Sequence, residues 1–251
     1  MRTTLAALLL LSLSAAAHAQ SPQQADWTYQ GKTGALVWGK IRPEYQACNK
    51  GNAQSPIDIR GARVDADLDP IEFHYIAGSV TITNTGQGVE VHVNPGSYIV
   101  ADDVRYNLIS YEFHHPSEHT VRGKFSDMEL DLIHRSVDNK EAIIAVRLSE
   151  QRQDPNAMLA TLWEHLPQQP GKSEKITAMV NPGGLLPGTR TYWTYMGSQL
   201  TPPCTEGVRW FVFVNDVSIS RIQLNAFVAL YKMNTRPTQD LNDRKITANG
   251  Q

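Results

Sequence analysis

The chain has 251 residues, with 23 Lys and Arg against 25 Asp and Glu, so its formal net charge at pH 7 is only −2. A charge so close to balance gives no electrostatic reason for binding to nucleic acid or to an anionic membrane. The length is large for one domain but ordinary for a large β-fold. The sequence has no charge run, low-complexity linker or internal repeat that would divide it into two domains.

The first segment has the pattern of a secretory signal peptide. Arg2 provides a positive start, residues 5–13 form an apolar run, and residues 17–19 read Ala-His-Ala, a small-x-small cleavage site. The run is too short for a stable membrane anchor, and no later stretch is apolar enough to span a bilayer. We expect a signal peptide at 1–19, one mature domain at 20–251, and a periplasmic or secreted protein without a membrane span. The alternative is a buried N-terminal helix.

Short runs with period-two alternation of apolar and polar residues recur along the mature chain. Clear examples are residues 79–84, 89–93, 129–133 and 210–214. Clusters of Asn, Gly and Pro separate the runs, as at 94–96 and 181–184. This pattern is typical of a β-dominated protein.

Helical patterns are confined to two short segments. Residues 156–166 follow an Asp-Pro entry signal, and residues 222–233 place Leu224, Phe227 and Tyr231 on one helical face. The sequence therefore predicts a mainly β, α+β domain in which a large sheet carries a few peripheral helices.

Two cysteines, Cys48 and Cys204, lie beyond the signal peptide. An even cysteine count in an exported protein is most simply explained by pairing, so we expect a disulfide between them. The alternative is two free buried thiols.

Several motifs occur together in one order along the chain. They are Gln-Ser-Pro-Ile-Asp-Ile at 54–59, Phe-His-His-Pro-Ser-Glu-His at 113–119, Thr-Pro-Pro-Cys-Thr-Glu-Gly-Val-Arg-Trp at 201–210 and Asn-Thr-Arg-Pro-Thr-Gln at 234–239. Their identity and order, from about residue 27 to 245, resemble the α-class carbonic anhydrases, including exported bacterial members. The resemblance implies a twisted, mostly antiparallel ten-stranded sheet with a central conical cavity. It also implies the Cys48–Cys204 disulfide.

The same resemblance implies zinc-dependent hydration of carbon dioxide, but this chain departs from the family at the metal. The three positions at which the family has zinc-binding histidines are Glu112, His114 and Asp131. Three neutral imidazoles leave zinc its full positive charge, which lowers the pKa of bound water to about 7. Two carboxylates would nearly cancel that charge. Zinc or another divalent metal is therefore possible at Glu112, His114 and Asp131 but is not assured.

Other histidines offer no obvious replacement ligand. His115 and His134 are expected on the faces opposite to His114 and Asp131 because side chains alternate along a strand, and the direction of His92 is open. His119 matches a family position that supports the ligands.

Three further family positions are altered. The threonine that orients zinc-bound hydroxide is replaced by Leu200, which cannot donate a hydrogen bond, although its glutamate partner is present as Glu118. The proton-shuttle histidine is replaced by Gln87, which does not titrate. The leucine of the carbon dioxide pocket is replaced by Gln199.

The resemblance also places further groups around the ligand positions. Glu129 matches a glutamate that orients a ligand histidine, and its usual partner here is Asp131, so the two carboxylates would repel unless one is protonated or a cation intervenes. Glu90 and Thr201 are further expected cavity residues. Together these carboxylates predict an acidic cone suited to a hard divalent cation or a positively charged ligand.

Three functions follow as hypotheses. The first is a non-catalytic, carbonic-anhydrase-related protein with little or no hydration activity that binds an unknown small molecule or protein. The second is an active metalloenzyme, a carbonate dehydratase or esterase-like hydrolase, with a Glu-His-Asp metal centre. The third is a periplasmic cation-binding module that uses the acidic cavity.

Overall fold

A computed structural model describes residues 25–151 and 155–250. The expected signal peptide at 1–19 lies outside these residues. No helix in the described part of the chain is long and apolar enough to cross a membrane.

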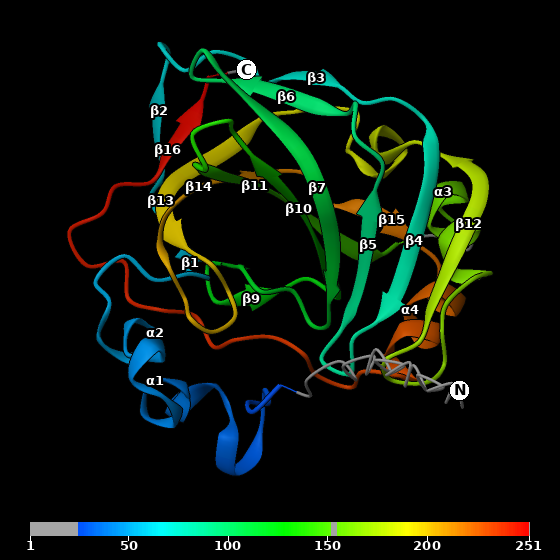
Figure 1. Ribbon diagram of the computed structural model, residues 1–251. Helices are drawn as coiled ribbons and strands as arrows, with labels where there is room; N and C mark the ends of the chain where they lie inside the picture. The colour runs from blue at the N-terminus through cyan, green and yellow to red at the C-terminus, as the bar shows by residue number, and fades with distance from the viewer. Residues whose placement is uncertain (1–24, 152–154, 251) are drawn as a thin grey trace, which may run out of the picture.

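One large twisted sheet organises the molecule (Figure 1). Ten of its thirteen described strands follow one another across the main path, so the sheet has three more strands than the ten that the resemblance implies. In spatial order these are β12 (Ser173–Val180), β4 (Gly78–Asn84), β5 (Val89–Val93), β7 (Val104–His114), β10 (Met128–Arg135), β11 (Glu141–Glu150), β14 (Glu206–Phe213), β13 (Tyr192–Ser198), β16 (Thr247–Asn249) and β2 (Arg63–Asp65).

Three further strands extend this sheet, and three others form a small one. β15 (Val217–Ile219) pairs with β11, while β6 (Tyr98–Ala101) joins β7 to β3 (Glu72–His74). The second sheet contains β1 (Asp58–Ile59), β8 (Thr120–Val121) and β9 (Lys124–Phe125). Most neighbouring strands are antiparallel, but β11 pairs with β14 and β15, β16 with β2, and β1 with β8 in parallel. The prediction of a mainly β fold is confirmed.

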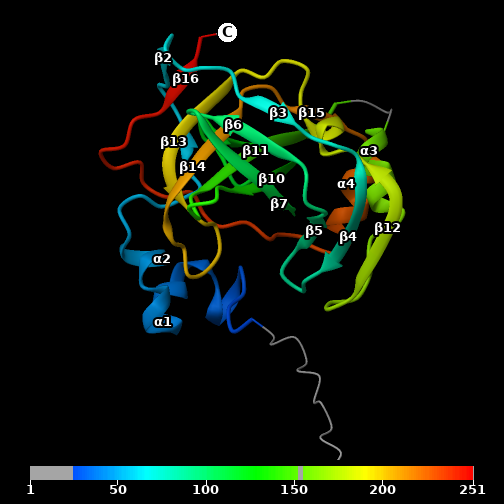
Figure 2. The ribbon, with the colours of Figure 1, turned by 45° about the horizontal axis from the view of Figure 1, so that its top comes forward.

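Helices lie at the edges of the sheet. α3 (Ala157–Trp163) and α4 (Arg221–Val228) pack together near β12, and both are shorter than the predicted helices at 156–166 and 222–233 (Figure 2). The sequence did not predict the short helical turns near the start: η1 (Gly31–Thr33), η2 (Ala35–Val37), α1 (Trp38–Ile41), η3 (Pro43–Tyr45) and α2 (Ala47–Lys50). η4 (Pro182–Leu185) follows β12. Segments this short carry too few residues to show a helical period.

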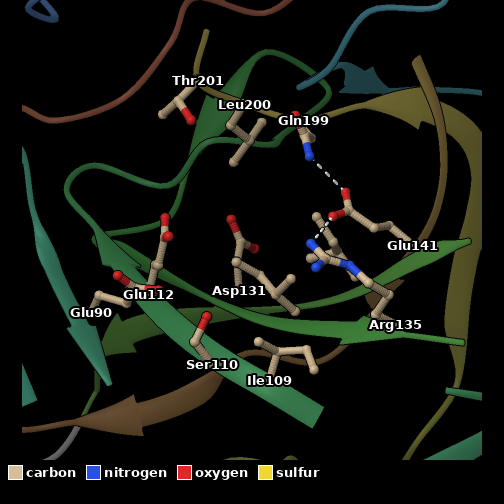
Figure 3. Close-up of a pocket in the computed structure, with 12 residues that line it drawn as sticks. Glu90, Ile109, Ser110, Glu112, Asp131, Arg135, Glu141, Gln199, Leu200 and Thr201 are labelled. Carbon is tan, nitrogen blue, oxygen red and sulfur yellow. Dashed lines mark hydrogen bonds and ion pairs between the residues drawn. The ribbon is translucent and has the colours of Figure 1, made fainter. Parts of the chain in front are cut away.

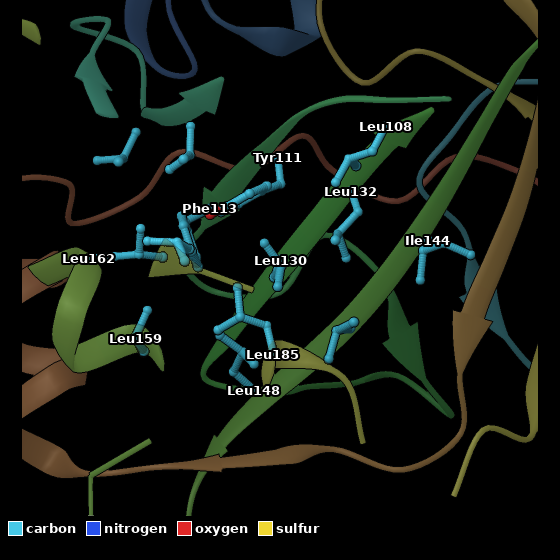
Figure 4. Close-up of a cluster of buried hydrophobic side chains, with 14 of the residues drawn as sticks. Leu108, Tyr111, Phe113, Leu130, Leu132, Ile144, Leu148, Leu159, Leu162 and Leu185 are labelled. Atoms are coloured by element: carbon cyan, nitrogen blue, oxygen red, sulfur yellow. The ribbon is translucent and has the colours of Figure 1, made fainter. Parts of the chain in front are cut away.

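Alternation along the central strands separates a hydrophobic core from the opposite face. Phe113, Leu130 and Ile144 point into a cluster that α3 covers with Leu159 and Leu162 (Figure 4). The residues between them, such as Glu112 and Asp131, point the other way. This alternation is the reason that polar and charged side chains from three strands meet on one side of the sheet.

The predicted disulfide is confirmed. Cys48 in α2 is bonded to Cys204 across 156 residues of sequence. The bond fixes the N-terminal turns to the loop after β13. Buried Arg236 is adjacent, and its guanidinium donates to the carbonyl oxygens of Cys48 and Ser55 at 2.6 and 2.7 Å.

Candidate functional site

Three carboxyl groups form a row across three neighbouring strands. Glu90 on β5 is paired in register with Glu112 on β7, and Glu112 is paired with Asp131 on β10. Residues in register point to the same face of a sheet, and like charges placed directly opposite one another are unfavourable. All three line a cavity of about 260 Å³ (Figure 3). The row therefore concentrates carboxyl oxygens in the lining of one cavity.

His114 lies beside this row. It is the last residue of β7 and is 2 % exposed. Its Nε2 atom is 3.8 Å from Glu112 Oε2 and 3.5 Å from Asp131 Oδ2. The structure thus brings the three family ligand positions together on one face.

The polar atoms at the centre of this group are buried. His114 donates from Nδ1 to the carbonyl oxygen of Asn234 at 3.0 Å, and the same nitrogen is 3.2 Å from Glu118 Oε1. Among the described residues, His114 Nε2 and both Asp131 carboxyl oxygens have no hydrogen-bond partner. Buried polar atoms of this kind normally find a partner, so the three atoms mark a place where a further group could bind.

Burial and mutual repulsion raise the pKa values of two acids in the site, Glu112 and Asp131. Burial, with the nearby charge of Glu129, holds the pKa of Asp131 well above its ordinary value. Burial also raises the pKa of Glu112, and the charges of Glu90 and Glu118 add to that rise. Both effects favour the neutral form of an acid.

The pKa of His114 is raised, although burial alone would lower it. Burial lowers the pKa of His114, but the hydrogen bond and charge of Glu118, with the charges of Asp131 and Glu112, outweigh it and raise the pKa to about 10. This direction favours the imidazolium form of His114 over the neutral form. A proton on the imidazole occupies the lone pair that a metal ligand needs.

Glu118 lies directly behind His114 and is fully buried. It accepts hydrogen bonds from the backbone N–H of Arg236 at 3.0 and 3.2 Å. The resemblance assigns this glutamate to fixing a threonine that orients hydroxide. Leu200, at that threonine's position, lines the cavity above Asp131 (Figure 3).

Glu129 takes its hydrogen bonds from His119. It accepts from the backbone N–H of His119 at 3.0 Å and from His119 Nδ1 at 2.6 Å, while the Tyr195 hydroxyl lies 2.7 Å from His119 Nε2. The hydrogen bonds of Glu129 are therefore made with His119, and the charge of Glu129 raises the pKa of Asp131, in agreement with the expected repulsion between the two carboxyl groups. Burial opposes ionisation of Glu129, but the charge and hydrogen bonds of His119 outweigh it and lower the pKa of Glu129.

One wall of the cavity is closed by a chain of polar contacts. Gln199 donates to Glu141 Oε2 at 2.9 Å, and Arg135 donates to Glu141 Oε1 at 2.6 Å (Figure 3). Thr201 also lines the cavity. The sequence reasoning missed Arg135 and Glu141, although Arg135 has the same strand parity as Asp131 and could have been found by that signal.

Apolar side chains complete the lining. Ile109, Ile133, Ile143 and Leu200 all line the cavity. Ile109 reaches it because β7 has one extra residue opposite Ile133 and His134 of β10, so that Ile109 and Ser110 both face the same side. A β-bulge changes the direction of side chains in this way. No feature of the local sequence predicted the bulge.

His115, His134 and Gln87 have partners away from the carboxyl row, whereas His92 contacts Glu90 within it. His115 donates from Nδ1 to Lys232 O at 2.8 Å, and His134 Nε2 lies 2.7 Å from the Tyr75 hydroxyl. His92 is half-exposed, with Nε2 3.2 Å from Glu90 Oε2. Gln87 donates to Trp27 O at 2.8 Å.

The donor set does not fit zinc as the family binds it. Within residues 25–151 and 155–250, no group of three or more His, Cys, Asp or Glu side chains is arranged to hold a metal ion. The chemistry of the side chains agrees, since two of the three donors are carboxyl groups and the raised pKa of His114 favours its protonated form. What this arrangement offers is acceptor oxygens beside an apolar wall.

Comparisons with known proteins agree with the fold. The family model for eukaryotic-type carbonic anhydrase matches residues 33–250. A carbonic anhydrase from Pectobacterium carotovorum is 34 % identical over 239 residues, covering 95 % of this chain and 97 % of that protein. The solved α-carbonic anhydrase from Thermovibrio ammonificans, in complex with the inhibitor sulfanilamide, is 38 % identical with a TM-score of 0.86, covering 89 % of this chain and 99 % of that one.

A further relative carries a different name. The solved structure of a dioscorin complexed with ascorbate is 30 % identical, with a TM-score of 0.82, and the match covers 90 % of this chain and 99 % of that one. With the family model spanning most of the described residues, and the disulfide and sheet order in place, this chain belongs to the α-class carbonic anhydrase family.

Proposed function

We propose that this protein is an exported member of the family with little or no carbon dioxide hydration activity, and that it acts by binding a ligand or partner at its cavity. The observation that carries the proposal is the donor set at the family ligand positions. Two carboxyl groups, Glu112 and Asp131, accompany one imidazole, His114, whose pKa is raised to about 10.

Hydration needs a metal that keeps its positive charge, because that charge makes bound water acidic near neutral pH. Carboxylate donors would neutralise the charge, and protonated donors would not bind the metal. Either state of Glu112 and Asp131 therefore works against hydroxide formation. The proposal does not depend on which state predominates.

The groups that assist hydration in the family are also replaced. Leu200 has no hydroxyl with which to orient a nucleophile, and Glu118 is engaged with His114 and the backbone of Arg236. Gln87 cannot carry a proton between solvent and the site. Binding functions need none of these groups, and the dioscorin structure in complex with ascorbate is an example of a similar fold with a small molecule bound.

Restoring the family residues tests the proposal. We expect Glu112→His, Asp131→His and Leu200→Thr together to bind one zinc ion and to hydrate carbon dioxide at least tenfold faster than the wild-type protein. Leu200→Thr alone is the matched control and should leave both properties unchanged, because the donor set is unaltered. Wild-type turnover equal to that of the triple variant would refute the proposal.

The second candidate is a metalloenzyme with a Glu-His-Asp centre. It is favoured by the buried Asp131 oxygens, which have no hydrogen-bond partner among the described residues. One histidine with two carboxylates is a known type of metal site. Near-stoichiometric metal in protein purified without chelator, together with hydrolysis of an activated ester that chelator abolishes, would select this candidate.

Export is proposed from the N-terminal pattern and agrees with the disulfide. Disulfides persist in oxidising compartments such as the periplasm. Mature protein that begins at Gln20 would confirm cleavage after Ala19, whereas retention of residues 1–19 would contradict it.

A further inference from the structure

The cavity combines two features that a single small ligand could satisfy. Its base carries Glu90, Glu112 and Asp131 in register on adjacent strands. The Asp131 side chain is only 3 % exposed, and within the described chain neither of its oxygens has a hydrogen-bond partner. A buried acceptor aimed into a cavity indicates a missing donor.

Arg135 and His114, two nearby basic side chains, contact other acids more closely than they contact Asp131. Arg135 contacts Glu141 at 2.6 Å, and His114 Nδ1 lies 3.2 Å from Glu118 Oε1. His114 Nε2 is 3.5 Å from Asp131 Oδ2, beyond good hydrogen-bond distance. A cation with several donors would therefore improve the contacts of Asp131 without breaking either of these pairs.

The space above the carboxyl groups suits a short apolar chain. Ile133, Ile143 and Leu200 line the same cavity as Glu112 and Asp131. Its volume of about 260 Å³ equals that of roughly nine water molecules at about 30 Å³ each, so a ligand of only a few heavy atoms fits. A metal ion would leave this apolar surface uncovered.

We propose that the cavity binds a small primary alkylamine as its ammonium ion, with the ammonium group between Glu112 and Asp131 and the alkyl chain along Ile133, Ile143 and Leu200. This proposal rests on the proposed function, since it places an organic cation where the family places zinc. Three N–H donors of the ammonium match the carboxyl oxygens in the row. A carboxylate ligand of equal size brings no N–H donor for these oxygens and would place its own acceptor oxygens against them, so it should not bind.

Calorimetric titration at pH 7 with n-butylamine tests the proposal, using mature protein freed of metal by chelator and dialysis. n-Butanol and butyrate are the matched neutral and anionic probes of nearly equal size. We expect one butylamine bound per chain, at least tenfold more tightly than n-butanol, and no binding of butyrate. Equal affinity for butylamine and butanol, or preferential binding of butyrate, would overturn the proposal.

Variants locate the binding. Asp131→Asn and Glu112→Gln should each weaken butylamine binding at least tenfold, while Asp138→Asn, at an exposed turn, should leave it unchanged. Glu112 is 35 % exposed, so its variant serves if the buried Asp131 variant does not fold. Unchanged affinity in a folded Glu112→Gln or Asp131→Asn variant would place the amine elsewhere and refute the assignment.

The two proposals fail in different ways. If the wild-type protein binds zinc and hydrates carbon dioxide, both the proposed function and this inference are refuted. Absence of hydration combined with no preference for butylamine would defeat the inference alone.

Discussion

Replacing Asp131 by Leu should stabilise the protein. The side chain is 3 % exposed, and in the described structure both its oxygens lack a hydrogen-bond partner. An unsatisfied buried polar group costs about 1–3 kcal/mol, and replacing it by an apolar group removes that cost. Leucine is larger than aspartate, but the adjoining cavity of about 260 Å³ has room for it. We therefore expect a gain of about 2 kcal/mol.

Thermal unfolding of the mature protein at neutral pH measures this gain. For a domain of this size, 1 kcal/mol corresponds to about 2–4 °C in Tm, so Asp131→Leu should raise Tm by about 4–8 °C. Asp138→Leu is the matched control at an exposed turn and should change stability by no more than about 0.5 kcal/mol. A Tm for Asp131→Leu below that of the wild type would refute the reasoning, because it would mean that the carboxyl group makes a net stabilising contact.

Three other predictions follow from the same structure. Replacing Cys48 and Cys204 by Ser should lower the free energy of unfolding by about 2–5 kcal/mol, and a denaturation midpoint equal to that of the wild type would contradict it. Folding raises the pKa of Asp131, so the folded protein binds this proton more tightly than the unfolded chain does. The resulting stabilisation is complete below pH 3.8, the ordinary pKa of the group, and is lost as pH rises toward the higher pKa of the folded state. As pH rises above 3.8, Tm should therefore fall less steeply in Asp131→Asn than in the wild type, and equal slopes would contradict the raised pKa of Asp131. Gly197→Ala should destabilise by about 1–3 kcal/mol or more, because a Cβ there would lie 2.1 Å from Ser55 Oγ; a folded variant with wild-type Tm would show that the contact can relax.

Much of the fold could be predicted because its signals are local. Period-two alternation at 89–93 and 129–133 corresponds to β5 and β10, and strand parity placed Glu112 with His114 and Glu129 with Asp131. The structure agrees with both placements. Local alternation determines which side chains share a face, so short segments of sequence are sufficient for this prediction.

The rest of the site depends on contacts between distant segments. Alternation does not fix the register that aligns Glu90, Glu112 and Asp131, because register is set by the packing of whole strands. The bulge at Ile109 and the salt bridge between Arg135 and Glu141 depend on the same tertiary pairing. These features give the cavity its apolar wall and its polar rim.

The partner of Glu129 shows a second limit of sequence reasoning. Family position predicted repulsion between Glu129 and Asp131 but gave no hydrogen-bond donor for Glu129. In the structure His119 supplies two hydrogen bonds, and the Tyr195 hydroxyl lies against the other side of its ring. Three-dimensional proximity to a better donor decides the pairing. Asp131 is left with its oxygens directed to the cavity, which is the basis of both proposals.

The most direct measurement is stopped-flow hydration of carbon dioxide by the wild-type mature protein, purified without chelator, with its metal content determined on the same sample. We expect well below one zinc ion per chain and a hydration rate indistinguishable from that of buffer, even after zinc is added. Near-stoichiometric zinc together with chelator-sensitive turnover would contradict the proposed function and would make Glu112, His114 and Asp131 a working metal centre.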